Sequence, residues 1–189
     1  SWREKVSLSY RKFATACLSL SLAMNIGLAA SVSTANTAEA AAEPNKLFEI
    51  SDSQYDEAVK LLSNYIKIDT TNPPGNEKLA ALYLQSVLKE NGIDAQVFDS
   101  AKDRAIVIGR LKGTGKKKAV ILLSHIDVVP AQASDWKYPP FAAEIHDGEL
   151  WGRGTLDMKG MGIMELAAML AIKKSGKVLP NYLASNIRK

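Results

Sequence analysis

The most constraining feature of this chain is an apolar run that ends in a histidine. Residues 119–130 read AVILLSHIDVVP, and the first five positions carry no polar side chain. A short, uninterrupted apolar run is typical of a strand that is covered on both faces, as in sheets flanked by helices. The run therefore predicts a central strand over residues 119–124. His125 then lies at the carboxyl end of a strand, where open α/β sheets place their ligand sites.

Patterns on either side of this run predict helices that alternate with strands. The first expected helix begins at Asp52 or Ser53 and buries Tyr55, Ala58, Leu62, Tyr65 and Ile66. The second is capped by Asn76, carries Leu79, Tyr83 and Val87, and ends before Gly92. The third covers 161–174 and directs Ile163, Met164, Ala167, Leu170 and Ala171 inward. Further strands are expected over 95–98 and 105–111, and a hairpin is expected to join 143–145 to 149–151 through His146, Asp147 and Gly148. This order predicts an α/β layered domain.

The first forty residues are typical of an export signal. Basic residues up to Lys12 precede an uncharged stretch over 13–38, and Ala38, Glu39 and Ala40 offer an A-x-A cleavage site. We therefore expect residues 1–40 to be a cleaved signal peptide, residues 41–53 to be a linker, and the protein to be secreted or periplasmic. The alternative is an uncleaved membrane anchor, although serine and asparagine residues leave the apolar part short of the ~20 residues that a spanning helix needs.

Charge and cysteine content exclude other classes of protein. The formal net charge is only +4, and +2 of it lies in the first forty residues. The +2 that remains is too little for a nucleic-acid-binding surface. The lysines at 116–118 lie beside Gly113 and Gly115 and indicate a solvated turn; this stretch also lacks the spacing of a phosphate-binding loop. Cys17 is the only cysteine, which excludes an intrachain disulfide, and we assign it to the signal peptide rather than to lipid attachment.

Three side chains could form a metal site. A metal-bound imidazole usually donates its second ring N–H to a carboxylate, and Asp127, two residues after His125, could accept that bond. Asp157 lies in the glycine-rich turn GRGTLDMKG over 152–160, and a carboxylate has two oxygens with which to bridge two cations.

Each residue alone also has an ordinary structural interpretation. His125 by itself would more often be a hydrogen-bonded structural histidine, and Asp157 by itself would more often cap the following helix. His146 lies in a turn rich in charged residues and is expected at the surface.

Together these segments resemble a known family. The segments are SHIDVVP over 124–130, W-x-x-x-P-F over 136–141 and DGELWGRGTLDMKG over 147–160, with IDTTNPPGNE upstream. They resemble the co-catalytic zinc peptidases and deacylases. This family includes aminoacylase-1, carboxypeptidase G, carboxypeptidase S, acetylornithine deacetylase and succinyl-diaminopimelate desuccinylase. The resemblance implies a three-layer α/β sandwich with a mixed, mainly parallel sheet. It also implies that His125 binds one metal ion, that Asp157 bridges two, and that Asp127 is the family's catalytic aspartate, which orients His125. The Asp157–Met158 peptide bond is expected to be cis.

The resemblance further implies cleavage of amide bonds in peptides or N-acyl amino acids by two zinc ions, or by other divalent ions such as cobalt. In the family a Glu-Glu pair soon follows, whereas no acidic residue follows Glu165 here. We therefore expect residues 54–189 to be the N-terminal part of a truncated catalytic domain, without the lid or dimerisation domain, and to be inactive alone. A homodimer is expected only for a full-length protein, and no stable membrane insertion is expected after signal cleavage. The alternative is a non-enzymatic, degenerate fragment with at most weak metal affinity.

Overall fold

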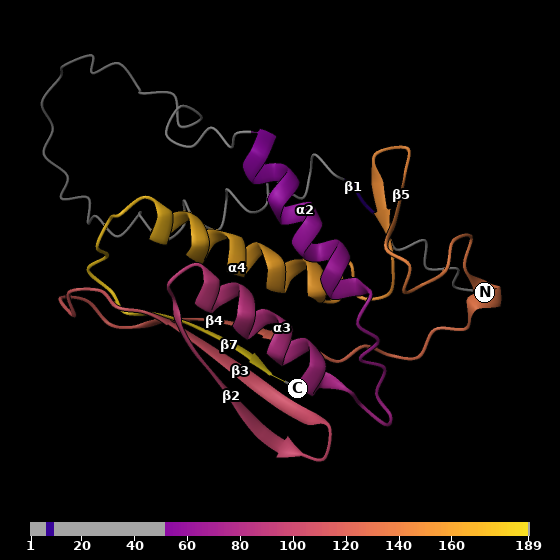
Figure 1. Cartoon of the computed structure of the whole chain (residues 1–189), viewed down its shortest axis with the longest axis horizontal. Coiled ribbons are helices and arrows are strands. Elements are labelled where there is room, and N and C mark those ends of the chain that lie inside the picture. The colour runs from indigo at the N-terminus through magenta and orange to yellow at the C-terminus, as the bar shows by residue number, and fades with distance from the viewer. Residues whose placement is uncertain (1–6, 10–51, 189) are drawn as a thin grey trace, which may run out of the picture.

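A computed structural model describes residues 7–9 and 52–188 of the chain (Figure 1). The helices are α2 (Asp52–Ile66), α3 (Glu77–Glu90) and α4 (Lys159–Lys174), with a 3-10 turn at Ala133–Asp135. The strands are β1 (Ser7–Ser9), β2 (Asp94–Ala101), β3 (Arg104–Leu111), β4 (Val120–His125), β5 (Glu144–His146), β6 (Glu149–Trp151) and β7 (Leu183–Arg188). Most of the expected signal peptide and linker lies outside the described residues. Of the helices in the described ranges, none is long and apolar enough to span a membrane.

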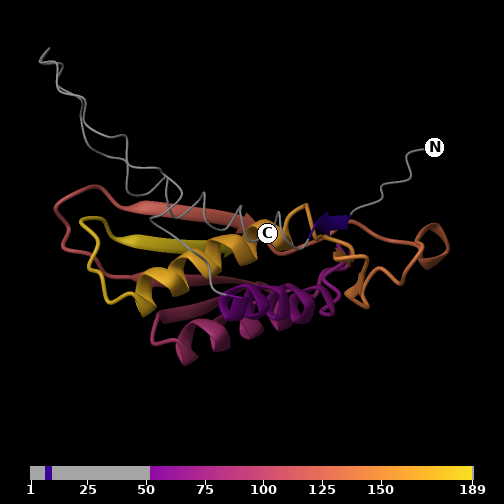
Figure 2. The same ribbon diagram turned by 90° about the horizontal axis from the view of Figure 1, so that it is seen from above.

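The main sheet is mixed, and the helices that the structure describes lie on one side of it (Figures 1 and 2). Its strand order is β2-β3-β7-β4, with β4 and β7 parallel and the two other neighbouring pairs antiparallel. The predicted α/β class is therefore confirmed. Within the described strands, however, the sheet is not mainly parallel and no second helical layer covers its other face. Only two residues connect β2 to β3, and so short a connection can join strands only in the antiparallel sense.

The position of β4 differs from the prediction of a central strand covered on both faces. Among the described strands β4 is the last in the sheet order, and its burial alternates along the strand. Leu122 and Ser124 face the helices and are buried, whereas Ile121 and Leu123 are 64% and 50% exposed. An apolar run alone does not show whether one or both faces are covered, because the covering elements are distant in sequence.

The exposed face of β4 leads us to expect self-association of the isolated chain. Ile121, Leu123 and Phe98 of β2 are large exposed apolar side chains on this sheet, and an open strand edge adjoins them. The double variant Ile121→Lys and Leu123→Lys should shift sedimentation-velocity profiles toward monomer. The control pair Leu79→Lys and Leu82→Lys, exposed on α3, should change the profile little. A wild-type chain that stays monomeric as its concentration rises would contradict this expectation.

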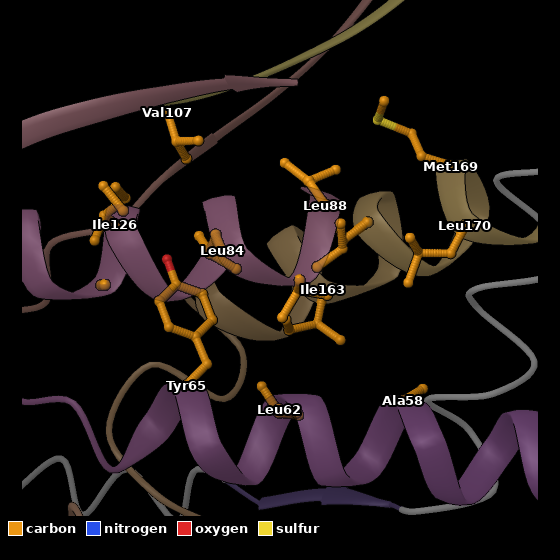
Figure 3. Packing of buried hydrophobic residues seen from close by; sticks show 14 of the residues in the cluster. Ala58, Leu62, Tyr65, Leu84, Leu88, Val107, Ile126, Ile163, Met169 and Leu170 are labelled. Carbon is orange, nitrogen blue, oxygen red and sulfur yellow. The ribbon is translucent and has the colours of Figure 1, made fainter. Parts of the chain in front are cut away.

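The hydrophobic core lies between the sheet and the helices (Figure 3). Leu62 and Tyr65 of α2 meet Leu84 and Leu88 of α3 and Ile163 of α4 in one buried cluster. The predicted apolar face of α2 is confirmed at each of its positions whose burial the structure describes: Ala58, Leu62, Tyr65 and Ile66.

The predicted face of α3 is partly wrong. Leu79 is exposed and Tyr83 only half-buried, while the buried side chains of this helix are Glu77, Ala80, Ala81, Leu84, Val87 and Leu88. The helix packs on β2 and β3, and Leu88 lies so close to Gly109 that a Cβ there would come within 2.9 Å of it. Asn76 occupies the predicted N-cap position without a side-chain cap bond, and Gly92 follows the helix with a φ of +68° as expected.

The inward face of α4 is also broader than predicted. Ile163 and Leu170 are buried as expected, Met164 and Ala167 are half-buried, and Ala171 is exposed. Leu166, Ala168 and Met169 are buried as well. Since α4 contacts both the sheet and α2, it is covered on two sides, and a helix of this kind has no single apolar stripe that its sequence can reveal.

The predicted hairpin is confirmed, but its first strand is shifted by one residue, so that His146 ends β5 and does not belong to the turn. β5 and β6 pair with His146 opposite Glu149, and Asp147 and Gly148 both have positive φ, as a type I′ turn requires. The other edge of β6 pairs with β1, with Leu8 opposite Leu150.

Candidate metal site

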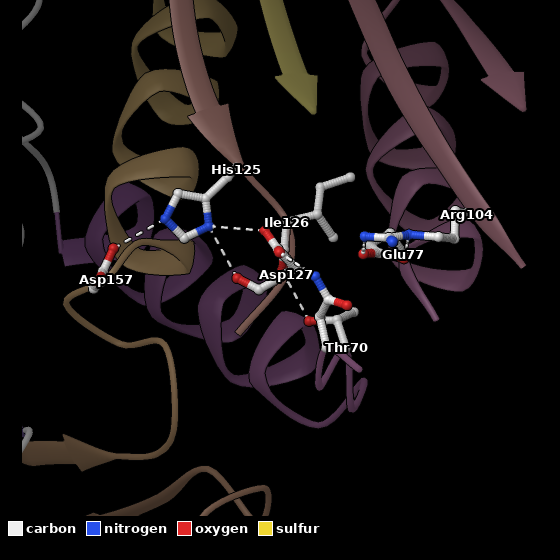
Figure 4. A network of polar contacts seen from close by, with 8 residues as sticks. Thr70, Glu77, Arg104, His125, Ile126, Asp127 and Asp157 are labelled. Carbon is white, nitrogen blue, oxygen red and sulfur yellow. Dashed lines mark hydrogen bonds and ion pairs between the residues drawn. The ribbon is translucent and has the colours of Figure 1, made fainter. Parts of the chain in front are cut away.

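The three predicted site residues meet at the carboxyl end of β4 (Figure 4). His125 is the last residue of that strand, Asp127 follows in the loop, and Asp157 comes from the turn before α4. The described structure therefore brings together residues that are 32 positions apart in the chain.

The Nδ1 atom of His125 faces two acceptors on the same residue. It lies 2.9 Å from the backbone oxygen of Asp127 and 3.3 Å from its Oδ1. A carbonyl oxygen accepts but does not donate hydrogen bonds, so we assign the proton to Nδ1. The predicted contact is present, but its cause differs from the expected alternation along a strand. β4 ends at His125, and the loop that follows brings Asp127 back to the imidazole.

The other ring nitrogen faces Asp157. Nε2 of His125 lies 3.0 Å from Oδ1 of Asp157, whose side chain is 91% exposed. Asp157 does not cap α4, because Met158 holds the N-cap position. The Asp157–Met158 peptide bond is cis, as the family resemblance implied.

Nε2 of His125 and Oδ1 of Asp157 are placed so that both could bind the same cation. With the proton on Nδ1, a neutral imidazole points its Nε2 lone pair at a carboxylate, an arrangement that a bound cation or a second ring proton stabilises. Two ligands of one tetrahedral zinc, each at about 2.0–2.2 Å, lie about 3.3 Å from one another, close to the separation found here. Over residues 7–9 and 52–188, however, no group of three or more histidine, cysteine, aspartate or glutamate side chains could hold a metal ion. The described residues fit part of a metal site and do not complete one.

His146 lies outside this arrangement. Its ring stacks on Tyr138 with 3.5 Å between ring centroids, and its Nε2 lies 2.6 Å from Oε2 of Glu144. The predicted surface location is only partly right, because His146 is half-buried by these two partners.

Sequence reasoning missed a buried lysine beside the site. Lys159, in the first turn of α4, is fully buried, and its Nζ donates hydrogen bonds to the backbone oxygens of Tyr65 at 3.1 Å and Ile68 at 2.6 Å. It thereby satisfies carbonyl groups at the end of α2, where intrahelical partners run out. Desolvation by burial lowers the pKa of Lys159 to about 7. In the sequence Lys159 is a single lysine in a glycine-rich turn. A lysine in such a turn is ordinarily exposed, so nothing in the sequence indicated that it is buried.

A buried glutamate behind β4 was missed as well. Glu165 of α4 accepts a hydrogen bond at 3.0 Å from the hydroxyl of Ser124, the residue before His125. Burial raises the pKa of Glu165 above its ordinary value, and the bond from Ser124 opposes that rise only in part.

This pKa shift predicts a pH-dependent stability. An acid whose pKa is raised on folding binds more protons in the folded than in the unfolded state just above its ordinary pKa. The free energy of unfolding therefore decreases as the pH rises through that window. The variant Glu165→Gln should lose less stability than the wild type between about pH 5 and about pH 8 in urea titrations. Glu90→Gln, at an exposed position on α3, is the matched control and should follow the wild type. Parallel pH profiles for wild type and Glu165→Gln would show the expectation to be wrong.

The chain forms an α/β domain whose candidate site resembles part of a metal site, and both features are found again in known proteins. Residues 121–183 match peptidase family M20/M25/M40, and this segment contains His125, Asp127 and Asp157. The resemblance inferred from SHIDVVP and GRGTLDMKG is therefore confirmed, and the matched segment is similar to the M20/M25/M40 peptidases.

Two curated relatives extend this match. A probable succinyl-diaminopimelate desuccinylase of Staphylococcus epidermidis is 35% identical over 119 residues, which cover 62% of this chain and 28% of the relative. Aminoacylase-1 of Dictyostelium discoideum is 33% identical over 132 residues, which cover 69% of this chain and 32% of the relative. The chain thus spans about a third of the length of these relatives.

A solved structure shows the same fold. The M20 family metallo-carboxypeptidase of Sulfolobus solfataricus superposes with a TM-score of 0.62 at 24% identity, over 70% of this chain and 30% of that one. Metallopeptidases and amidohydrolases are thus the enzyme class that this chain resembles.

Proposed function

We propose that this chain contributes His125, Asp127 and Asp157 to the metal site of an exported amide-bond hydrolase. The proposed substrates are peptides or N-acyl amino acids, in line with the carboxypeptidase and aminoacylase among its relatives. The single observation that carries the proposal is the 3.0 Å approach of His125 Nε2 to Asp157, with Nδ1 held by Asp127.

Each residue has a separate role in this proposal. Asp127 accepts the Nδ1 proton of His125 and thereby fixes the tautomer that leaves Nε2 as a metal ligand. Asp157 supplies a carboxylate at that nitrogen and has a second oxygen for a second ion. Zinc, or another divalent ion such as cobalt, supplies Lewis acidity to such a site and lowers the pKa of a bound water.

The proposal also includes export of the protein and a low hydrolytic activity of this chain by itself. The basic start, the apolar stretch and the A-x-A site of residues 1–40 support a cleaved signal peptide, a linker over 41–53 and a secreted or periplasmic location. A catalytic zinc generally uses three protein ligands, whereas among the described residues the carboxylate at Nε2 of His125 is that of Asp157 and no group of three candidate ligands is found. We therefore expect the 189-residue chain to bind zinc weakly and to hydrolyse amides at no appreciable rate by itself.

Metal titration of the whole chain tests the assignment. Calorimetry with Zn²⁺, and visible absorption with Co²⁺, should show weak binding that His125→Ala and Asp157→Ala abolish. His146→Ala removes the other histidine and should leave binding unchanged. Equal binding by all four proteins would refute the assigned site and favour the alternative, a non-enzymatic fragment.

A parallel assay tests competence. Dipeptides and N-acyl amino acids are offered to the chain with excess zinc, and the wild type should match His125→Ala at background hydrolysis. Hydrolysis by the wild type that His125→Ala abolishes would overturn the expected incompetence while supporting the site.

A further inference from the structure

The loop between α2 and α3 runs along the segment that follows β4. The hydroxyl of Thr70 donates a hydrogen bond at 2.8 Å to the backbone oxygen of Ile126. The backbone N–H of Val128 donates to Thr70 at 3.1 Å, and the backbone N–H of Asn72 donates to Val128 at 2.9 Å. These bonds lie on both sides of Asp127, so they set the loop in a fixed register opposite that residue.

In this register the Asn72 side chain reaches the Asp127 carboxylate. Nδ2 of Asn72 donates a hydrogen bond at 2.9 Å to Oδ2 of Asp127. The other oxygen, Oδ1, lies 3.3 Å from Nδ1 of His125, which also lies 2.9 Å from the backbone oxygen of Asp127. One carboxylate therefore bridges an amide donor and the imidazole, and its rotation is restricted from the side opposite His125.

The main-chain contacts of the loop do not require this amide. Backbone groups and the Thr70 hydroxyl make the three bonds that hold the loop to the segment after β4. Removing the Asn72 amide therefore frees the Asp127 carboxylate while those bonds remain. An Asn72 variant can therefore lose the positioning of the Asp127 carboxylate while the loop stays bonded to the segment after β4.

We propose that Asn72 is a positioning residue for His125, acting through the carboxylate of Asp127. Its amide holds that carboxylate against Nδ1–H as a second acceptor beside the backbone oxygen of Asp127, which helps to keep the proton on Nδ1 and Nε2 directed at Asp157. The inference deepens the proposed metal site and rests on the assignment of His125 as a ligand of that site. Neither the patterning of the sequence nor the spacing of its motifs assigns this role to Asn72.

The first test observes the imidazole directly in the metal-free full chain. Two-bond ¹H–¹⁵N correlation spectra of the histidine rings distinguish the Nδ1–H from the Nε2–H tautomer. At a pH at which the imidazole is neutral, the wild type should show His125 with its proton on Nδ1. Asp127→Ala should shift the ring toward a mixture of tautomers. Asn72→Ala should shift it in the same direction, and the nearly isosteric Asn72→Asp, which cannot donate and repels Asp127, should shift it further.

A neighbouring asparagine provides the matched control. Asn76 lies in the same loop, and its Nδ2 makes a 3.4 Å bond to the backbone oxygen of Asp69. Asn76→Ala should leave the His125 spectrum unchanged. Helical circular dichroism and the melting temperature are recorded for every variant, and Asn72→Leu, which has no side-chain donor, serves if Asn72→Ala fails to fold. An unchanged His125 tautomer in the folded Asn72 variants would overturn the proposal, as would an unchanged tautomer in Asp127→Ala.

Zinc affinity gives a second readout through a double-mutant cycle. Asn72→Ala should weaken zinc binding about tenfold, as residues that orient a ligand typically do. In the Asp127→Ala background the same change should have no further effect, since the carboxylate through which it acts is gone. Additive losses would contradict action through Asp127. A tautomer shift without zinc binding by the wild type would refute the proposed metal site and leave the positioning role supported.

Discussion

Arg104→Ala should lower the free energy of unfolding by about 3–5 kcal/mol, because it leaves a buried carboxylate without its partner. Glu77, the first residue of α3, has a fully buried side chain and binds Arg104 through two hydrogen bonds of 2.7 Å and 3.2 Å. Its carboxylate also lies against Gly75, where a Cβ would come within 2.7 Å of Oε2. The loss should therefore extend to the loop that carries Asn72. Urea denaturation followed by circular dichroism measures it.

Two further variants test whether the loss of stability in Arg104→Ala comes from the burial of the ion pair and not from the loss of any ion pair. Lys78 forms a 2.8 Å ion pair with Asp99 in which both side chains are exposed, and Lys78→Ala should change stability by at most about 1 kcal/mol. Replacing both Glu77 and Arg104 by methionine removes the buried charge together with its partner and should recover most of the stability lost in Arg104→Ala. Equal effects of Arg104→Ala and Lys78→Ala would show that the Glu77 pair is not energetically special.

Leu84→Ala should lower the free energy of unfolding by about 2–5 kcal/mol, the range for truncating a buried leucine. Leu84 is fully buried where α3 meets α2 and the sheet (Figure 3). The loss combines the transfer free energy of the removed methyl groups with the cavity that close-packed neighbours cannot fill. Thermal and urea denaturation measure it.

The same substitution two residues earlier in the same helix is the control. Leu82 is 44% exposed, so Leu82→Ala should change the free energy of unfolding by about 0.5 kcal/mol or less. Since both changes alter helix propensity equally, their difference reports packing alone. A loss for Leu82→Ala as large as that for Leu84→Ala would mean that the faces of α3 are assigned wrongly.

Local chemistry in the sequence determined the elements of this protein and much of its candidate site. The apolar run before His125 forms a strand, Gly92 follows α3 with the positive φ that suits glycine, and Asp147 and Gly148 turn the hairpin. These features depend on residues next to one another, so their sequence is sufficient to predict them. The motif resemblance added that His125 and Asp157, far apart in sequence, should meet, and they do.

Tertiary structure decided which faces are covered and which polar groups are buried. The spacing of Leu79, Tyr83 and Val87 indicates a helix, but only the position of β3 beneath α3 determines which side is inward. Lys159 is buried because it bonds to a carbonyl 94 residues earlier in the chain.

The same reason applies to Glu77 and Asn72, whose partners lie 27 and 55 residues away. A polar side chain is tolerated in the interior only where a partner meets it. Periodicity records the spacing of residues along one element, whereas burial and polar pairing depend on contacts between elements, which exist only once the chain has folded.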